Sequence, residues 1–137
     1  MSNEHTVKSY EEELRYLIDS VIKMGSLTES QLVDSMDAVI KVDKDSIDKI
    51  IKSDDEINKF RSKIDTQIMT LLVKRAPMAI DLRETISSLK ISQDLERIGD
   101  LSKSNAKKVK PLPLDLPEEL LGNLKRLGDL VIKQLND

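Results

Sequence analysis

The chain has 137 residues, no cysteine and a formal net charge of −3, with 34% charged and 2% aromatic residues. The lack of cysteine excludes a disulfide framework and a thiolate metal site. No apolar run reaches the length of a membrane span, and the N-terminal stretch lacks the apolar core of a signal peptide. We therefore expect a cytoplasmic, all-α protein with charged helix faces.

The first expected helix covers residues 10–41 and follows a segment, residues 1–8, that we expect to be flexible. Apolar and small residues recur in it at alternating steps of four and three, which indicates the packing seam of a helical bundle. This expected seam consists of Leu14, Ile18, Val21, Gly25, Thr28, Leu32, Ser35 and Val39. The stripe is widened by Leu17, Met24, Leu27 and Met36.

A polar break at residues 41–45 offers two candidate N-caps, Asp43 and Asp45. The second expected helix then runs to about residue 75, because Pro77 cannot continue it. The same alternation of steps predicts its seam, with two polar interruptions at Asp54 and Arg61. The seam consists of Ile47, Ile50, Asp54, Ile57, Arg61, Ile64, Ile68 and Leu71.

The third expected helix covers residues 78–109. Short connections force neighbouring helices to be antiparallel, so residues 9–109 are expected to form an up-down-up three-helix bundle, like a spectrin repeat. Three prolines make residues 110–117 a stiff linker. A fourth helix is expected over residues 118–137, with Asp115 as a plausible N-cap and Pro117 in the first turn.

An internal repeat relates residues 23–34 to residues 126–137 without gaps. Both segments lie in the first helix after a break, which favours a true repeat over chance. We therefore expect the fourth helix to begin a second, truncated unit, packed against the bundle, a neighbouring chain or nothing stable. The identical pairs are Gly25/Gly128, Leu27/Leu130, Gln31/Gln134, Leu32/Leu135 and Asp34/Asp137.

The third helix has two candidate packing faces. At about 100° per residue, an apolar stripe near its start leads into acidic residues near its end. The stripe consists of Met78, Leu82, Ile86 and Leu89, and it continues through Gln93, Glu96 and Asp100. Ile91, Leu95 and Ile98 lie on the opposite side, so we expect both faces to contact something. We expect the stripe that ends in Glu96 and Asp100 to extend the core seam, and Leu95 and Ile98 to face a second packing surface.

The acidic pair Glu96 and Asp100 is the main candidate site. The two carboxylates lie one turn apart, so they repel each other unless a cation, an arginine or solvent compensates. Oxygen ligands suit hard metal ions, and Glu29 of the parallel first helix is expected at the same level. The alternative, which is common for acid pairs on charged helices, is that the pair forms salt bridges or faces water.

The remaining chemistry points away from catalysis. Asp94 lies on another side of the helix, and Asp81 is too far along it to join the pair, so Asp81 could instead pair with Arg83. The only histidine, His5, lies outside the expected bundle and cannot activate a serine there. The four glycines are isolated, which excludes a phosphate-binding loop. Nucleic-acid binding is not expected from an acidic chain without an aromatic platform.

Four stretches resemble the PhoU family, specifically the N-terminal half of its members. They are YEEEL at residues 10–14, KMGSLTESQL at residues 23–32, RAPMAIDLR at residues 75–83 and LKISQDLERIGD at residues 89–100. The last two are the most specific, and they contain Asp81, Arg83, Asp94 and Arg97. The resemblance implies two tandem three-helix units, which would account for the internal repeat.

The resemblance also implies a function. PhoU proteins are cytoplasmic, usually self-associating regulators that repress the phosphate-starvation response through contact with the phosphate importer ATPase and a membrane sensor histidine kinase. Some members bind iron or zinc through Glu/Asp-x-x-x-Asp motifs, which Glu96 and Asp100 match. Leu101 stands where the family often has a histidine or another polar or aromatic residue, which removes an auxiliary ligand. The alternative is a generic helical scaffold or oligomerisation module without a link to phosphate.

Overall fold

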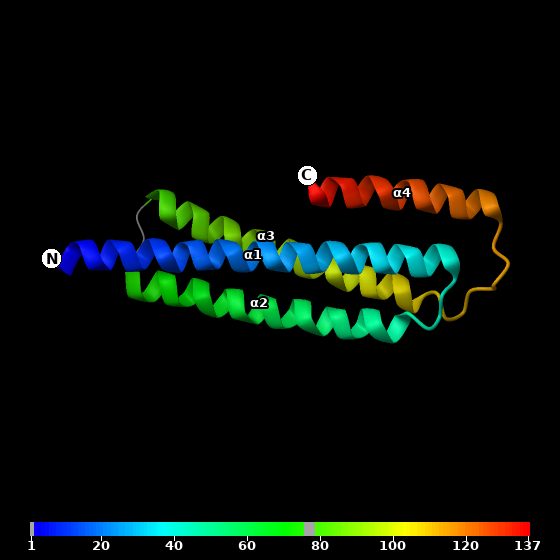
Figure 1. The fold of residues 1–137 in the computed structure, drawn as a ribbon, viewed down its shortest axis with the longest axis horizontal. Coiled ribbons are helices and arrows are strands. Elements are labelled where there is room, and N and C mark those ends of the chain that lie inside the picture. Colours follow the sequence, from blue (N-terminus) through cyan, green and yellow to red (C-terminus); the bar gives the residue numbers. More distant parts are fainter. Residues whose placement is uncertain (1, 76–78) are drawn as a thin grey trace.

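The computed structural model describes the backbone of residues 2–75 and 79–137, and the side chains of residues 7–74 and 81–137. Every regular element in these ranges is an α-helix, as expected: α1 Ser2–Lys41, α2 Ile47–Arg75, α3 Ala79–Lys107 and α4 Glu118–Asn136. Three helices lie lengthwise side by side, and α4 runs back along α1 (Figure 1). Helix α1 begins at Ser2, whereas the first helix was expected to begin at about residue 10.

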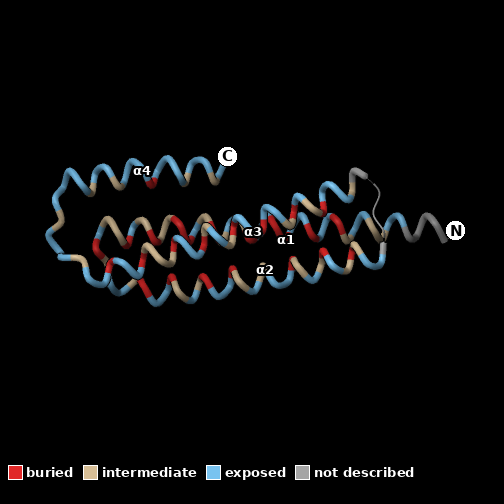
Figure 2. The backbone as a smooth tube through the Cα atoms, turned by 180° about the vertical axis from the view of Figure 1, so that it is seen from behind, coloured by how far each residue is buried: buried red, intermediate tan, exposed pale blue. Residues whose placement is uncertain are grey.

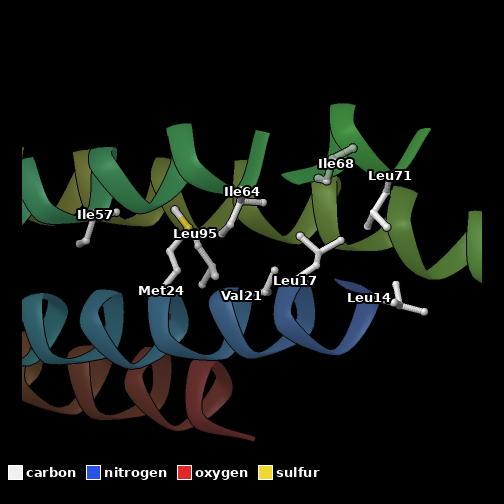
Figure 3. Packing of buried hydrophobic residues seen from close by; sticks show 9 residues of the cluster. All are labelled: Leu14, Leu17, Val21, Met24, Ile57, Ile64, Ile68, Leu71 and Leu95. Atoms are coloured by element: carbon white, nitrogen blue, oxygen red, sulfur yellow. The ribbon is translucent and has the colours of Figure 1, made fainter. Parts of the chain in front are cut away.

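The seam of α2 agrees with the prediction. Seven of its eight expected residues are buried, and the eighth, Arg61, is half-buried. Isoleucine at alternating steps makes one strongly apolar face, so the inward side of α2 is unambiguous. Figure 3 shows how this face meets α1 and the single leucine that α3 contributes, in a cluster of Leu14, Leu17, Val21, Met24, Ile57, Ile64, Ile68, Leu71 and Leu95.

The seam of α1 is turned slightly from the expected one. At every second position of the expected seam, the buried residue is instead the one that precedes it in the sequence. Leu17 and Met24 are therefore fully buried, while Ile18 is exposed. The reason is that α1 packs on two sides: Leu32, Met36 and Val39 lie on the flank that α4 covers. The observed seam consists of Leu14, Leu17, Val21, Met24, Thr28, Gln31, Ser35, Ala38 and Val42.

The expected inward face of α3 is wrong. Leu82 and Asp100 are exposed, and Met78 lies outside the described residues. The observed inward seam consists of Thr85, Ser88, Ser92, Leu95, Gly99, Ser102, Ala106 and Val109. Its hydroxyl groups donate hydrogen bonds to carbonyl groups of α3 itself, such as Thr85 to Asp81 at 2.7 Å and Ser102 to Ile98 at 2.8 Å. Satisfied hydroxyls of small volume allow close helix packing without apolar periodicity.

The turn between α1 and α2 contains a buried valine with a left-handed backbone. Val42 has φ 50°, and the Asp43 N–H donates to the Ala38 carbonyl at 2.9 Å, which closes α1 in a Schellman arrangement. Glycine usually occupies such a position, but the Val42 side chain packs against Ile47 and Val109. This packing offsets the cost of the strained backbone.

Asp43 is the carboxylate that organises the start of α2. It accepts hydrogen bonds from the Asp45 N–H at 3.0 Å and the Ser46 hydroxyl at 2.6 Å. The bond from Ser46 is the main cause that lowers the pKa of Asp43. The stabilisation is therefore present above the ordinary carboxyl pKa of 3.8 and is lost as pH falls through the lowered value.

Helix α4 packs on the outside of the bundle. Figure 2 shows that buried residues line the interior of α1, α2 and α3, whereas α4 is mostly exposed and buries Gly128. A Cβ atom at Gly128 would lie 2.6 Å from Met36 Cε, so glycine allows close approach to α1. The N-cap of α4 is Pro117, not Asp115, and it makes no side-chain cap bond. The Pro117 carbonyl instead accepts the Leu121 N–H at 3.1 Å.

Candidate functional site

The segment of α3 from Asp94 to Asp100 carries the motif and has residues on several sides of the helix. Leu95 and Gly99 are buried and face α1 and α2, which corrects the expectation that Leu95 faces a second packing surface. Glu96 is half-buried at the edge of the bundle. Asp94, Arg97 and Asp100 are exposed. Glu96 and Asp100 therefore do not continue the core seam.

Glu96 has a partner on the neighbouring helix. Its Oε2 atom lies 3.1 Å from Nε of Arg61 on α2. The Arg61 side chain is only 14% exposed, and it also pairs with Asp65 and donates to the Ser92 hydroxyl. The guanidinium compensates the charge of Glu96, so the repulsion expected between Glu96 and Asp100 is reduced.

One turn further along, a polar layer crosses the whole bundle. We define the layer as Gln31, Asp54, Gly99 and Lys103, which come from α1, α2 and α3. Asp54 is 0% exposed, and its Oδ2 atom lies 2.6 Å from Nζ of Lys103. The Gln31 amide group donates to Asp54 Oδ1 at 3.1 Å and to the Gly99 carbonyl at 2.8 Å.

The hydrogen bond to Asp54 raises the pKa of Lys103, against the opposing effect of burial, and nearby Asp100 and Asp55 act in the same direction as the bond. The stabilisation from Lys103 is thus present below the ordinary lysine pKa of 10.5 and is lost as pH rises through the raised value. The Lys103 ammonium is consequently charged across the physiological range. Sequence patterning indicated Asp54 as an interruption in the α2 seam, but it gave no sign of Gln31 or Lys103 as its partners.

The other predicted residues are scattered around the bundle. The levels of α1 and α3 match as expected, since Gln31 contacts Gly99. However, Glu29 stands two residues before Gln31 and points about 160° away from it around α1. Asp81 lies near Tyr10: burial raises the pKa of the Tyr10 phenol, and the charge of Asp81 acts in the same direction. Arg83 is exposed.

A metal ion would need more donors than this segment brings together. Among the side chains that the structure describes, no three His, Cys, Asp or Glu residues are grouped so that they could share an ion. In the described part of the chain, Glu29, Glu96 and Asp100 do not form such a group. With Glu96 paired to Arg61 and Asp100 exposed on its own, these two carboxylates do not by themselves fit an iron or zinc site.

A cavity of about 280 Å³ lies between α1, α4 and the linker. It is mostly apolar, with an amide and an ammonium group from the end of α3 at its edge. Its lining comprises Leu32, Met36, Val39, Asn105, Lys108, Leu112, Leu124, Leu127, Gly128 and Val131. None of the helices in the described part of the chain has the length and apolarity needed to cross a bilayer.

Comparison with known proteins connects this geometry to a family. The PhoU domain model matches residues 21–109, which include the polar layer and Glu96–Asp100. The phosphate-specific transport system accessory protein PhoU homolog of Caulobacter vibrioides is 38% identical over 135 residues, or 98% of this chain and 59% of that protein. The homolog of Rhizobium meliloti is 36% identical over 138 residues, or 100% of this chain and 58% of that protein.

A third relative, the PhoU homolog of Xylella fastidiosa, is 38% identical over 128 residues, which cover 93% of this chain and 53% of that protein. The chain thus spans little more than half the length of these curated relatives. No solved structure gave a significant match. The domain match over most of the bundle and the identity over nearly the whole chain establish that the protein belongs to the PhoU family.

Proposed function

We propose that this chain is the N-terminal part of an accessory protein of a phosphate-specific transport system. The observation that carries the proposal is the identity with accessory proteins of that name over 98% of the chain. Identity at this level argues against the alternative that the likeness reflects shared bundle packing alone. The described helices form a packed bundle with exposed charged and apolar faces, which suits a protein that acts by contact.

The finer function follows the family. The full protein would repress phosphate uptake and the phosphate-starvation response when phosphate is plentiful. It would do so in the cytoplasm, as a dimer or another self-associated form, through contact with the importer ATPase and with the phosphate-sensing histidine kinase. The protein would act by these contacts and would not catalyse a reaction.

A tandem second unit is part of this proposal, and α4 supports it. The internal repeat pairs the buried core residue Met24 of α1, which is 0% exposed, with Leu127 of α4, which is 60% exposed. About two turns further along, the same relation pairs buried Gln31 with exposed Gln134. The outer face of α4 therefore has the pattern of a core seam, and two further helices would cover it in the second unit.

Binding by the full-length protein tests the proposed function. We expect the purified full-length protein to retain the importer ATPase and the cytoplasmic part of the sensor kinase in a pull-down. In cells with ample phosphate, loss of the protein should raise expression of a phosphate-starvation reporter, and the intact gene should restore repression. Absence of binding to both partners, together with an unchanged reporter, would contradict the proposal.

Metal binding at Glu96 and Asp100 remains a prediction that requires donors from outside the described residues. We expect elemental analysis of the native full-length protein to find iron or zinc. The double variant Glu96→Gln/Asp100→Asn should lose most of this metal, because it lacks the negatively charged carboxylate oxygens that bind the cation. Asp94→Asn is the matched control, since Asp94 is an exposed acid in the same segment. Equal metal content in the double variant and the control would show that the site is elsewhere or absent.

A further inference from the structure

Helix α3 has two faces that could point inward, and the less apolar one does. The inward seam around Ser88, Ser92 and Ser102 consists largely of small or hydroxyl-bearing residues. Large apolar residues elsewhere on the helix remain exposed, among them Ile91 at 48% and Leu101 at 57%. Apolar burial alone therefore does not determine which way α3 is turned.

The polar layer makes contacts that depend on the rotation of α3. The Lys103 ammonium reaches Asp54 at 2.6 Å, and the Gly99 carbonyl accepts the Gln31 amide at 2.8 Å. In any other rotation, the fully buried carboxylate of Asp54 would lose its ammonium partner. An uncompensated buried charge is strongly unfavourable, whereas apolar contacts can be exchanged for similar ones.

Gly99 also favours this rotation of α3 for a steric reason. A Cβ atom there would already lie 3.4 Å from both Asp54 Oδ1 and Ile57 Cδ1. A side chain larger than alanine at this position would meet these atoms, so the glycine side of α3 suits the close approach to α2 at the level of the layer. A rotated helix would bring side chains with a Cβ and more into that space.

We infer that the layer of Gln31, Asp54, Gly99 and Lys103 is a rotational key that determines which face of α3 packs inward. Its consequence is to hold the motif segment in one orientation, with Asp94, Arg97 and Asp100 on the surface. Buried polar groups that select one arrangement among several apolar ones are known from coiled coils, where one polar core residue specifies register.

Single cysteines can test the rotational key because the chain has none of its own. Ile91 and Ser92 are neighbours about 100° apart around the helix, and they are 48% and 0% exposed. We expect Ile91→Cys to react with a maleimide at least about tenfold faster than Ser92→Cys in the otherwise unchanged chain. Adding Gln31→Met, Asp54→Leu and Lys103→Met should bring this ratio towards one, because the turned states become accessible.

The control pair is on α2, whose own apolar seam defines its orientation. Met69 is 59% exposed and Ile68 is 2% exposed. The Met69→Cys to Ile68→Cys rate ratio should therefore remain high in the layer variant. An unchanged ratio for the α3 pair in a folded layer variant would overturn the inference, because packing alone would then orient α3.

A gentler variant covers the case in which the triple substitution unfolds the bundle. Asp54→Asn with Lys103→Met removes both charges, while asparagine keeps the shape of aspartate. The ratio of maleimide reaction rates for the cysteine pair on α3 should therefore fall, while the ratio for the pair on α2 stays high. Loss of both ratios in this variant as well would also overturn the inference, since the layer would then support the whole fold and not the rotation of α3. If both ratios stayed high in this variant, the inference would also be overturned, because α3 would keep its orientation without the charges of the layer.

Discussion

Replacing Ile64 by alanine should lower the free energy of unfolding by about 2–5 kcal/mol, the range for truncating a fully buried aliphatic side chain. Ile64 is 0% exposed and lies in the central cluster between α1 and α2 (Figure 3). The substitution removes apolar burial and leaves a cavity that rigid helices cannot close completely. Urea unfolding followed by circular dichroism measures the change.

Met69→Ala is the matched control for this prediction. It lies five residues further along the same helix, and its side chain faces outward, so its removal should change the free energy of unfolding by less than about 0.5 kcal/mol. If Ile64→Ala were as mild as Met69→Ala, Ile64 could not occupy the core position that the structure assigns to it.

The second large effect is expected for Gly99→Leu, which should destabilise the chain by about 1–3 kcal/mol or more through overpacking. A Cβ atom at Gly99 is already in contact with Asp54 and Ile57, so the rest of a leucine side chain would enter the polar layer. It would also separate the Asp54 carboxylate from its donors on α1 and α3. Gly99→Ala should be far milder, because 3.4 Å is an ordinary contact distance for a Cβ atom.

Gly122→Leu controls for the general effect of replacing a glycine within a helix. No atom lies within 4 Å of a Cβ at Gly122, and leucine has the higher helix propensity, so stability should stay the same or rise slightly. Comparison of the unfolding midpoints of the two leucine variants isolates the packing effect. Equal midpoints would contradict the close approach of α3 and α2 at Gly99.

Much of the fold could be predicted from periodicity. The seam of α2 was correct because its isoleucines form one apolar face without a competing alternative. The seam of α1 was turned by one position because the helix has apolar residues on two flanks, one towards the core and one towards α4. The matched levels of α1 and α3 followed from helix lengths and short connections.

The site was less accessible to such reasoning. That Glu96 and Asp100 lie one turn apart is a property of the sequence, but the partner of Glu96 is Arg61, which comes from another helix. Asp43 was predicted as a candidate N-cap, but α2 begins only at Ile47, and Asp43 instead accepts hydrogen bonds from Asp45 and Ser46 within the preceding turn. Asp115 is not the N-cap of α4, because the helix begins at Glu118 and Pro117 is its N-cap residue.

The sequence by itself determined that this protein is a bundle of long α-helices of the PhoU family, because helix periodicity, breaks and motif residues are local properties of the chain. Only the tertiary structure decided which face of α3 is buried and which charges are paired. The physical reason is that small hydroxyl-bearing residues carry no periodic apolar signal. The energy of a buried carboxylate such as Asp54 depends on partners that folding brings from two other helices.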